Sequence, residues 1–199
     1  MKKLLIFGGT FNPVHNGHVN LCKTLRCKIN ADKVIIVPTY MPVHKDVNDS
    51  LISPIHRVNM CKIAFSQVGN CEINEIEIKN QKPCYTVDTL LYFKQLYKND
   101  TLYFACGSDM FLSLDTWKDT NKLFSLAVFC AIPRTNEYDL MLKKGRELSK
   151  MGLEYKIFDV DYIETSSSKI RENLKEFKTD KNLDVKVLDY IISNGLYGV

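Results

Sequence analysis

The sequence has few of the features that mark secreted, metal-binding or membrane-spanning proteins. No stretch of its 199 residues approaches the ~20 consecutive apolar residues that a membrane-spanning helix needs. The apolar run at residues 4–7 follows two lysines, but it is too short for a signal peptide and two glycines end it. The seven cysteines are odd in number and none forms a Cys-x-x-Cys pair, which argues against a disulfide framework and a zinc site. We therefore expect a cytoplasmic protein without a membrane partner.

An excess of charge of one sign is also missing. The 27 Lys and Arg against 23 Asp and Glu give a net charge of +4, which favours small anionic ligands. A nucleic-acid-binding protein would need a stronger basic stripe, so no nucleic-acid partner is expected. Because the sequence also has no repeats, low-complexity tracts or linkers, we expect a single domain over residues 1–199.

The residues that are present are organised around positions 4–18. The apolar run at 4–7 has the length of a buried parallel strand. Gly8 and Gly9 follow at once, where the backbone must turn sharply or let a ligand come close. From Asn16 on, apolar residues recur at helical spacing, so we expect His18 in the first turn of a helix capped by Asn16. A strand, a glycine turn and a helix N-terminus with histidines together predict a phosphate site.

Each of these features alone has a simpler interpretation. A lone histidine on an apolar helix face is usually a packed core residue, and a Gly-Gly pair after a strand is often only a turn. The segment is also not a dinucleotide fingerprint, because Gly8-Gly9 lacks the later glycine of G-x-G-x-x-G. It is not a P-loop either, since the Gly-Lys-Ser/Thr ending is missing.

A second anion site is predicted in the C-terminal helical part, residues 165–199. Ser166, Ser167 and Ser168 precede a helical run, and several N–H groups at one helix start attract an anion. Arg171 follows one turn later, where its guanidinium can reach the same anion. A serine-rich cap with a solvated arginine explains this segment equally well.

Strand and helix patterns alternate along the whole chain, which predicts an α/β fold with a doubly wound, Rossmann-like parallel sheet. Two glycine turns, at Gly8-Gly9 and at Gly107, follow the first and fourth strands and would flank the topological switch point. Strands are expected at residues 4–7, 34–37, 72–78, 101–106, 126–132 and 155–158, and helices beginning near residues 16, 54, 86, 138 and 185.

Residues 8–18, Gly-Gly-Thr-Phe-Asn-Pro-Val-His-Asn-Gly-His, resemble the N-terminal signature of the bacterial nicotinate-nucleotide adenylyltransferases, which belong to the His-x-Gly-His nucleotidyltransferases. The family often has aspartate where this chain has Asn12. Four more blocks resemble the family in its order. They are Pro-x-x-x-Pro-x-His-Lys at 38–45, Cys-Tyr-Thr-x-Asp-Thr at 84–89 (the family has serine first), Gly-Ser-Asp at 107–109 with a later tryptophan, and Thr-Ser-Ser-Ser-x-Ile-Arg at 165–171 (the family has Ile-Ser-Ser-Thr).

The resemblance implies adenylyl transfer from ATP to nicotinate mononucleotide, which gives nicotinate adenine dinucleotide and pyrophosphate in NAD biosynthesis. It implies that Mg²⁺ arrives with the ATP phosphates, without a protein cage for the metal and without a tightly bound organic cofactor. The implied catalytic residues are His15, His18, Lys45 and Arg171. The implied ATP-binding residues are Gly8, Gly9, Thr10, Phe11, His15, His18, Gly107, Ser166, Ser167, Ser168 and Arg171, and the implied nicotinate mononucleotide-binding residues are His44, Lys45, Tyr85, Thr86, Asp109 and Trp117.

Several alternatives stay open at this point. A phosphopantetheine adenylyltransferase shares His-x-Gly-His, and a nucleotide-sensing module could bind without turnover. A class I aminoacyl-tRNA synthetase fragment would need a Lys-Met-Ser-Lys-Ser segment, which the sequence lacks. Trp117 is a core residue or, after a polar stretch, a partly exposed platform for a pyridinium ring. Arg57 also matches the family, although a surface ion pair explains it equally well. The sequence assigns no role to Asn12 or Arg134, no choice between nicotinate and nicotinamide mononucleotide, and leaves a homo-oligomer open.

Overall fold

The computed structural model describes residues 1–42, 51–160, 163 and 165–199. The predicted phosphate contacts of His44 and Lys45 therefore lie outside the described residues. The strands are β1 (Lys3–Gly9), β2 (Lys33–Pro38), β3 (Cys71–Ile73), β4 (Thr101–Gly107), β5 (Val128–Ile132) and β6 (Tyr155–Ile157). The helices are α1 (Asn16–Ile29), α2 (Pro54–Ala64), α3 (Ile76–Asn80), α4 (Thr86–Leu96), α5 (Ser108–Leu112), α6 (Thr120–Phe124), α7 (Tyr138–Ser149), α8 (Ser167–Phe177) and α9 (Val185–Ser193), with short 3-10 turns η1 (Phe65–Gln67), η2 (Leu114–Thr116) and η3 (Leu196–Gly198).

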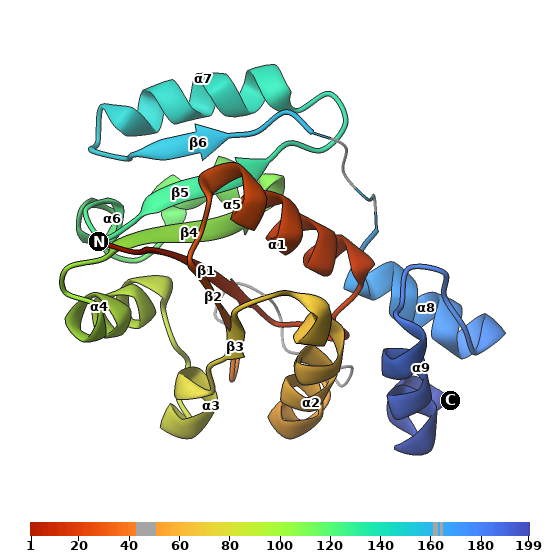
Figure 1. Ribbon diagram of the computed structural model, residues 1–199. Helices are drawn as coiled ribbons and strands as arrows, with labels where there is room; N and C mark the ends of the chain where they lie inside the picture. Colours follow the sequence, from red (N-terminus) through yellow and green to blue (C-terminus); the bar gives the residue numbers. More distant parts are fainter. Residues whose placement is uncertain (43–50, 161–162, 164) are drawn as a thin grey trace. The chain divides into compact units, whose positions relative to one another are not determined.

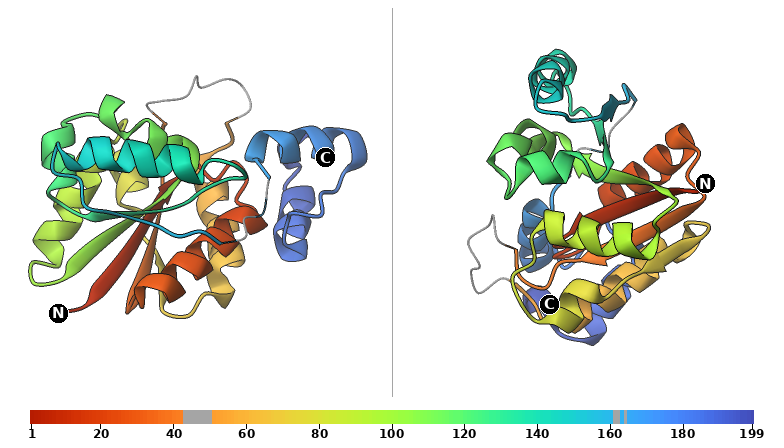
Figure 2. Two further views of the ribbon diagram at one scale, coloured as in Figure 1. Left: turned by 90° about the horizontal axis from the view of Figure 1, so that it is seen from above. Right: turned by 90° about the vertical axis from the view of Figure 1, so that its left-hand side faces the viewer.

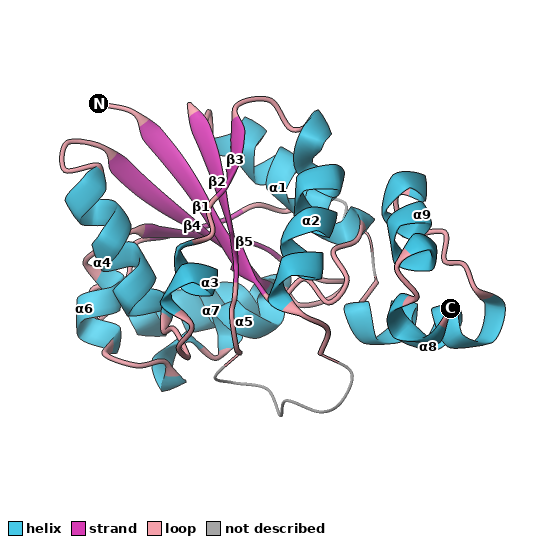
Figure 3. Ribbon diagram, turned by 90° about the horizontal axis from the view of Figure 1, so that it is seen from below, coloured by secondary structure: helices cyan, strands magenta, loops and turns pink. Residues whose placement is uncertain are grey.

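The described strands form a six-stranded sheet in the order β3-β2-β1-β4-β5-β6. The pairs β1–β4, β4–β5 and β5–β6 are parallel, and β3, β2, β1 and β4 are seen side by side in Figure 3. The chain begins in the middle of this order, extends it in one direction with β2 and β3, and then in the other from β4 on. This is a doubly wound Rossmann-like arrangement, as the alternation of patterns predicted. The switch point lies between β1 and β4, so the glycine turns after these two strands flank it, as expected.

The chain groups into two compact units, and the first comprises residues 1–8, 21–35 and 85–162. Its strands β4 and β5 are buried, and α5 packs against both of them. Helix α7 lies along β6, as Figure 1 shows. The two elements pack closely at Gly145 of α7, which lies against Tyr155 of β6. A Cβ on Gly145 would overlap the ring of Tyr155, so the absence of a side chain allows this close packing.

The second unit comprises residues 9–20, 36–84 and 163–199. Here α2 packs against α9 and β3, and the 3-10 turn η3 packs against both α8 and α9, which lie together near the C-terminus in Figure 2. The loop after β1 and the C-terminal segment therefore belong to the same unit. The expectation of one domain over residues 1–199 stays a prediction.

One predicted strand is largely a helix. Residues 72–78 alternate as a strand would, but only β3, ending at Ile73, is extended, and α3 begins at Ile76. The cause is Asn74, whose backbone N–H donates to the carbonyl of Ile36 and whose side-chain oxygen accepts from the N–H of Ile76. This local bond turns the chain out of the sheet.

Two smaller expectations also fail. The apolar spacing of residues 90–96 predicts that Leu96 faces inward, but it is 56% exposed at the end of α4. The residue type of Thr86 predicts that it caps this helix, but the cap is Tyr85 and Thr86 is the first residue of α4. No helix in the described part of the chain is long and apolar enough to cross a membrane.

Candidate active site

The loop between β1 and α1 is shaped by the ring of Phe11. This residue adopts a left-handed backbone conformation, with φ of 51°, and its side chain is 1% exposed. A Cβ on Gly9 would lie 2.9 Å from the Phe11 ring, so position 9 must be a glycine. The ring meets that of His18 edge-on, with 5.1 Å between the centroids. The glycines predicted that a group comes close to the backbone here. At Gly9 that group is the Phe11 ring, a side chain of the same loop.

His15 and His18 form a stacked pair at the start of α1. Their ring centroids are 3.6 Å apart and the rings are inclined by 30°. The N–H of His15 donates to Nδ1 of His18 at 3.2 Å, so a neutral His18 carries its proton on Nε2, the outer nitrogen, as a donor. A Cβ on Gly17 would lie 3.0 Å from Nδ1 of His15. Gly17 thus gives the His15 ring its place in the pair.

Burial controls the protonation of His15. The side chain is 5% exposed, and loss of hydration lowers its pKa from 6.5 to about 4, while the charge of Asp180 acts in the opposite direction. Asp180 is itself buried and accepts hydrogen bonds from the side chain of Asn173 and the N–H of Asn182. The carbonyl of Asn182 accepts in turn from the N–H of Asn16, at the start of α1. His15 is therefore neutral at pH 7 in the free protein.

The start of α8 meets the same loop. Ser166 caps the helix by accepting from the N–H of Lys169 at 3.2 Å, as the serine-rich pattern predicted. The hydroxyl of Ser167 donates to the carbonyl of Pro13 at 2.9 Å. The segments of the two predicted anion sites, residues 9–18 and 165–171, thus lie in the second unit and contact each other there.

Arg171 bridges the two segments. One end of its guanidinium donates to the carbonyl of Asn12 at 2.7 Å, and the other donates to the hydroxyl of Ser168 at 3.2 Å. These bonds fix the plane of the guanidinium against the loop. A guanidinium has five N–H donors, so both bonds together leave donors for an anion.

Arg57 is a fully buried arginine under the same loop, which excludes the open alternative of a surface ion pair. Its side chain is 0% exposed and donates to the carbonyls of Thr10, Thr39, Tyr40 and Ile52. Burial lowers its pKa, but an arginine stays protonated in proteins. It ties the segments after β1 and β2 to the start of α2. No sequence signal marks this role, because the carbonyls come from three separate segments.

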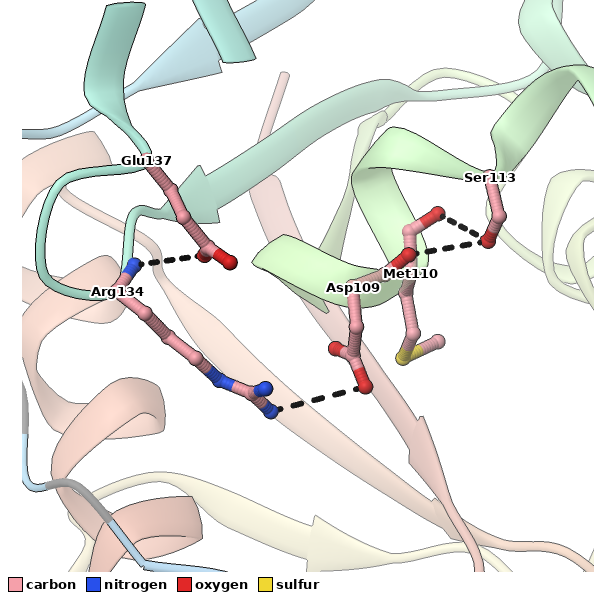
Figure 4. A network of polar contacts seen from close by, with 5 residues as sticks. All are labelled: Asp109, Met110, Ser113, Arg134 and Glu137. Atoms are coloured by element: carbon pink, nitrogen blue, oxygen red, sulfur yellow. Dashed lines mark hydrogen bonds and ion pairs between the residues drawn. The ribbon is translucent and has the colours of Figure 1, made fainter. Parts of the chain in front are cut away.

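The first unit holds the glycine turn after β4. The carboxylate of Asp109 lies 3.6 Å from the guanidinium of Arg134, and the backbone N–H of Arg134 donates to the carboxylate of Glu137 at 3.3 Å (Figure 4). A Cβ on Gly107 would lie 2.8 Å from Oδ1 of Asp109, so Gly107 leaves room for the carboxylate. Asp109 is 62% exposed, and such an ion pair contributes little to stability. The structure thus gives Arg134 a contact that the sequence did not.

The remaining predicted ring-binding residues also lie in the first unit. Trp117 is partly exposed, as its polar surroundings predicted, and it meets the buried ring of Phe104 edge-on at 6.2 Å. The ammonium of Lys118 lies 4.1 Å from the centroid of the Tyr85 ring, a cation–π distance that no local pattern in the sequence predicts. In the described residues, no group of three or more His, Cys, Asp or Glu side chains is placed to hold a metal ion.

Comparison with known proteins places this arrangement in a family. Residues 6–173 match the family model described as cytidylyltransferase-like. The chain is 35% identical over 196 residues to a probable nicotinate-nucleotide adenylyltransferase of Borrelia turicatae, which covers 98% of this chain and 97% of the relative. It is 34% identical over 203 residues to the nicotinate-nucleotide adenylyltransferase of Bacillus subtilis, with 99% of both chains covered. The fold also matches the Plasmodium falciparum nicotinic acid mononucleotide adenylyltransferase complexed with NaAD, with a TM-score of 0.81 at 24% identity over 99% of this chain and 98% of that one.

Proposed function

The chain belongs to the nicotinate-nucleotide adenylyltransferases, and from this premise we propose that it transfers the adenylyl group of ATP to nicotinate mononucleotide. An oxygen of the mononucleotide phosphate attacks the α-phosphorus of ATP. The bond from that phosphorus to the bridging oxygen of the β-phosphate breaks, and pyrophosphate leaves with the electron pair. The second pKa of a phosphate monoester is about 6, so the attacking oxygen is already ionised at neutral pH and needs no general base.

The protein must therefore align two anions and stabilise the charge that develops at the α-phosphate. The observation that carries the proposal is the stacked pair of His15 and His18 in one unit with Arg171 and the serine-capped start of α8. We assign the Nε2–H of His18 to the α-phosphate, since Nδ1 already accepts from the backbone. Arg171 and the N-terminal N–H groups of α8 suit the β- and γ-phosphates.

His15 starts the reaction as a neutral ring. The polyphosphate charge raises the pKa of a nearby histidine, and the Asp180 carboxylate already acts in that direction. We therefore propose that His15 takes up a proton as ATP binds. Mg²⁺ arrives on the ATP phosphates, because it usually keeps several waters and binds through substrate phosphates in such sites.

For the mononucleotide, we propose that Trp117 stacks on the pyridinium ring and that Tyr85 and Thr86 line the ring pocket. A tryptophan face is the strongest aromatic platform for a cation, and the ring of Trp117 is partly exposed. Asp109 would hold a ribose hydroxyl. We also infer a cytoplasmic location, because the seven cysteines are scattered, odd in number and without a Cys-x-x-Cys pair, as is typical of proteins in a reducing compartment.

The first experiment mixes the purified protein with ATP, Mg²⁺ and nicotinate mononucleotide and measures pyrophosphate release and the dinucleotide product. We expect turnover, and its absence would refute the proposal. His18→Ala should lower kcat at least about a hundredfold with a smaller change in KM, because its bond matters most in the transition state. His56→Ala is the matched control, since it removes a half-buried histidine of α2 that bonds to Tyr190 instead. Comparing kcat/KM for nicotinate and nicotinamide mononucleotide then fixes the substrate preference.

A further inference from the structure

Asn12 is the centre of a buried network that links three distant segments of the second unit. Its side-chain oxygen accepts from the hydroxyl of Tyr197 at 2.8 Å and from the N–H of Ile52 at 3.4 Å. Its backbone carbonyl accepts from the guanidinium of Arg171 at 2.7 Å. The side chain is 6% exposed, so water does not replace these partners easily.

The hydroxyl of Tyr197 keeps its proton and is a hydrogen-bond donor in this network. Tyr197 is 9% exposed and adopts a left-handed conformation in η3, a turn that packs against α8 and α9. Burial raises the pKa of its hydroxyl well above the ordinary tyrosine value, so the proton stays on the oxygen at any physiological pH. In the structure this hydroxyl donates its proton to the side-chain oxygen of Asn12.

The position of Arg171 depends on this pair. The guanidinium is held between the carbonyl of Asn12 and the hydroxyl of Ser168, which lies on the same helix. The carbonyl is therefore the anchor outside α8 that directs the guanidinium toward the loop. Any rotation of the Asn12 residue would move this carbonyl, and the bonds of Tyr197 and Ile52 to the side chain oppose such a rotation.

We propose that Asn12 and Tyr197 form a positioning pair, which acts through the Asn12 carbonyl to hold Arg171 where it binds the pyrophosphate part of ATP. Only one part of this inference rests on the proposed function, namely that Arg171 binds the pyrophosphate part of ATP. The pair does not touch the reacting atoms, so its loss weakens phosphate binding more than it slows the chemical step.

The test compares two tyrosines of the same unit. Tyr197→Phe removes the hydroxyl that holds Asn12, whereas Tyr190→Phe removes a hydroxyl that bonds to His56 and Asn59 of α2 instead. We expect Tyr197→Phe to raise KM for ATP and the Kd for magnesium pyrophosphate by about five- to tenfold, with kcat changed less than about threefold. Tyr190→Phe should leave all three within about twofold. Equal effects of the two variants would overturn the proposal.

A double-mutant cycle separates positioning from a general loss of stability. If Tyr197 acts through Arg171, Tyr197→Phe should raise KM for ATP no further once Arg171→Lys is present. Multiplicative effects of the two changes would refute the coupling. Asn12→Asp keeps both acceptor bonds and should keep the coupling to Tyr197, whereas Asn12→Ala should behave like Tyr197→Phe. The Kd for pyrophosphate is read without turnover, so it reports on the pair even if the wild-type protein were inactive toward nicotinate mononucleotide.

Discussion

The buried His15 predicts a specific loss of stability in mild acid. Its pKa is about 4 in the folded protein and 6.5 in an unfolded chain. Above pH 6.5 the ring is neutral in both states, so its contribution is fully present. Between pH 6.5 and 4 the unfolded chain binds a proton that the folded protein does not bind, and the free energy of unfolding falls. Below pH 4 both states are protonated and the effect levels off.

The size of this loss follows from the two pKa values. The difference of about 2.5 pKa units corresponds to about 3 kcal/mol in full, at 1.36 kcal/mol per unit, and to about 2 kcal/mol at pH 5. The assay is urea unfolding of the wild type and of His15→Gln between pH 7.5 and 4. Titrating carboxylates affect both proteins, so the difference between the two curves isolates the histidine. The wild type should lose about 2 kcal/mol more than the variant between pH 7.5 and 5. Parallel curves would refute the assignment of His15 as a buried neutral ring.

Two substitutions test the packing around the site. Arg57→Met should lower the free energy of unfolding by about 2–4 kcal/mol in urea unfolding, because four backbone carbonyls lose their donor, whereas Arg146→Met on the exposed face of α7 should change it by less than about 0.5 kcal/mol. Equal effects of these two changes would contradict the buried role of Arg57. Gly17→Ala should lower kcat/KM about tenfold in the pyrophosphate-release assay, because its Cβ would lie 3.0 Å from both Nδ1 of His15 and Cγ2 of Thr165 and must displace the ring. A wild-type kcat/KM in a folded Gly17→Ala protein would show that the ring position does not matter.

The parts of the site that the sequence predicts are those with local signals. The strand, glycines and helix start at residues 4–18 follow from short-range spacing, and so does the serine cap of α8. The doubly wound arrangement also follows, because the alternation of strands and helices restricts the topology. The strand predicted at residues 72–78 fails because Asn74 overrides the alternation with one local hydrogen bond.

Contacts between distant segments leave no such signal. Arg57 looks like any arginine of an amphipathic helix until three separate segments bring their carbonyls to it. Tyr197 and Asn12 are 185 positions apart, and no spacing in the sequence connects them. Similarly, the depressed pKa of His15 depends on how deeply the folded chain buries the ring, which residue types alone do not reveal. The sequence therefore predicts the local elements around the candidate site better than the long-range contacts that hold them in place.

The bond between Tyr197 and Asn12 has a consequence for protein synthesis. A ribosome adds Asn12 early and must then add the next 185 residues before Tyr197 exists. During translation the histidine loop can be extruded and surrounded by its strands while the donor that holds Asn12 is still missing. A nascent chain that stalls before α9 therefore lacks η3 and, with it, Tyr197, the donor that holds Asn12. The position of Arg171 is secured only once Tyr197 has been added, so products truncated before this residue should bind ATP more weakly.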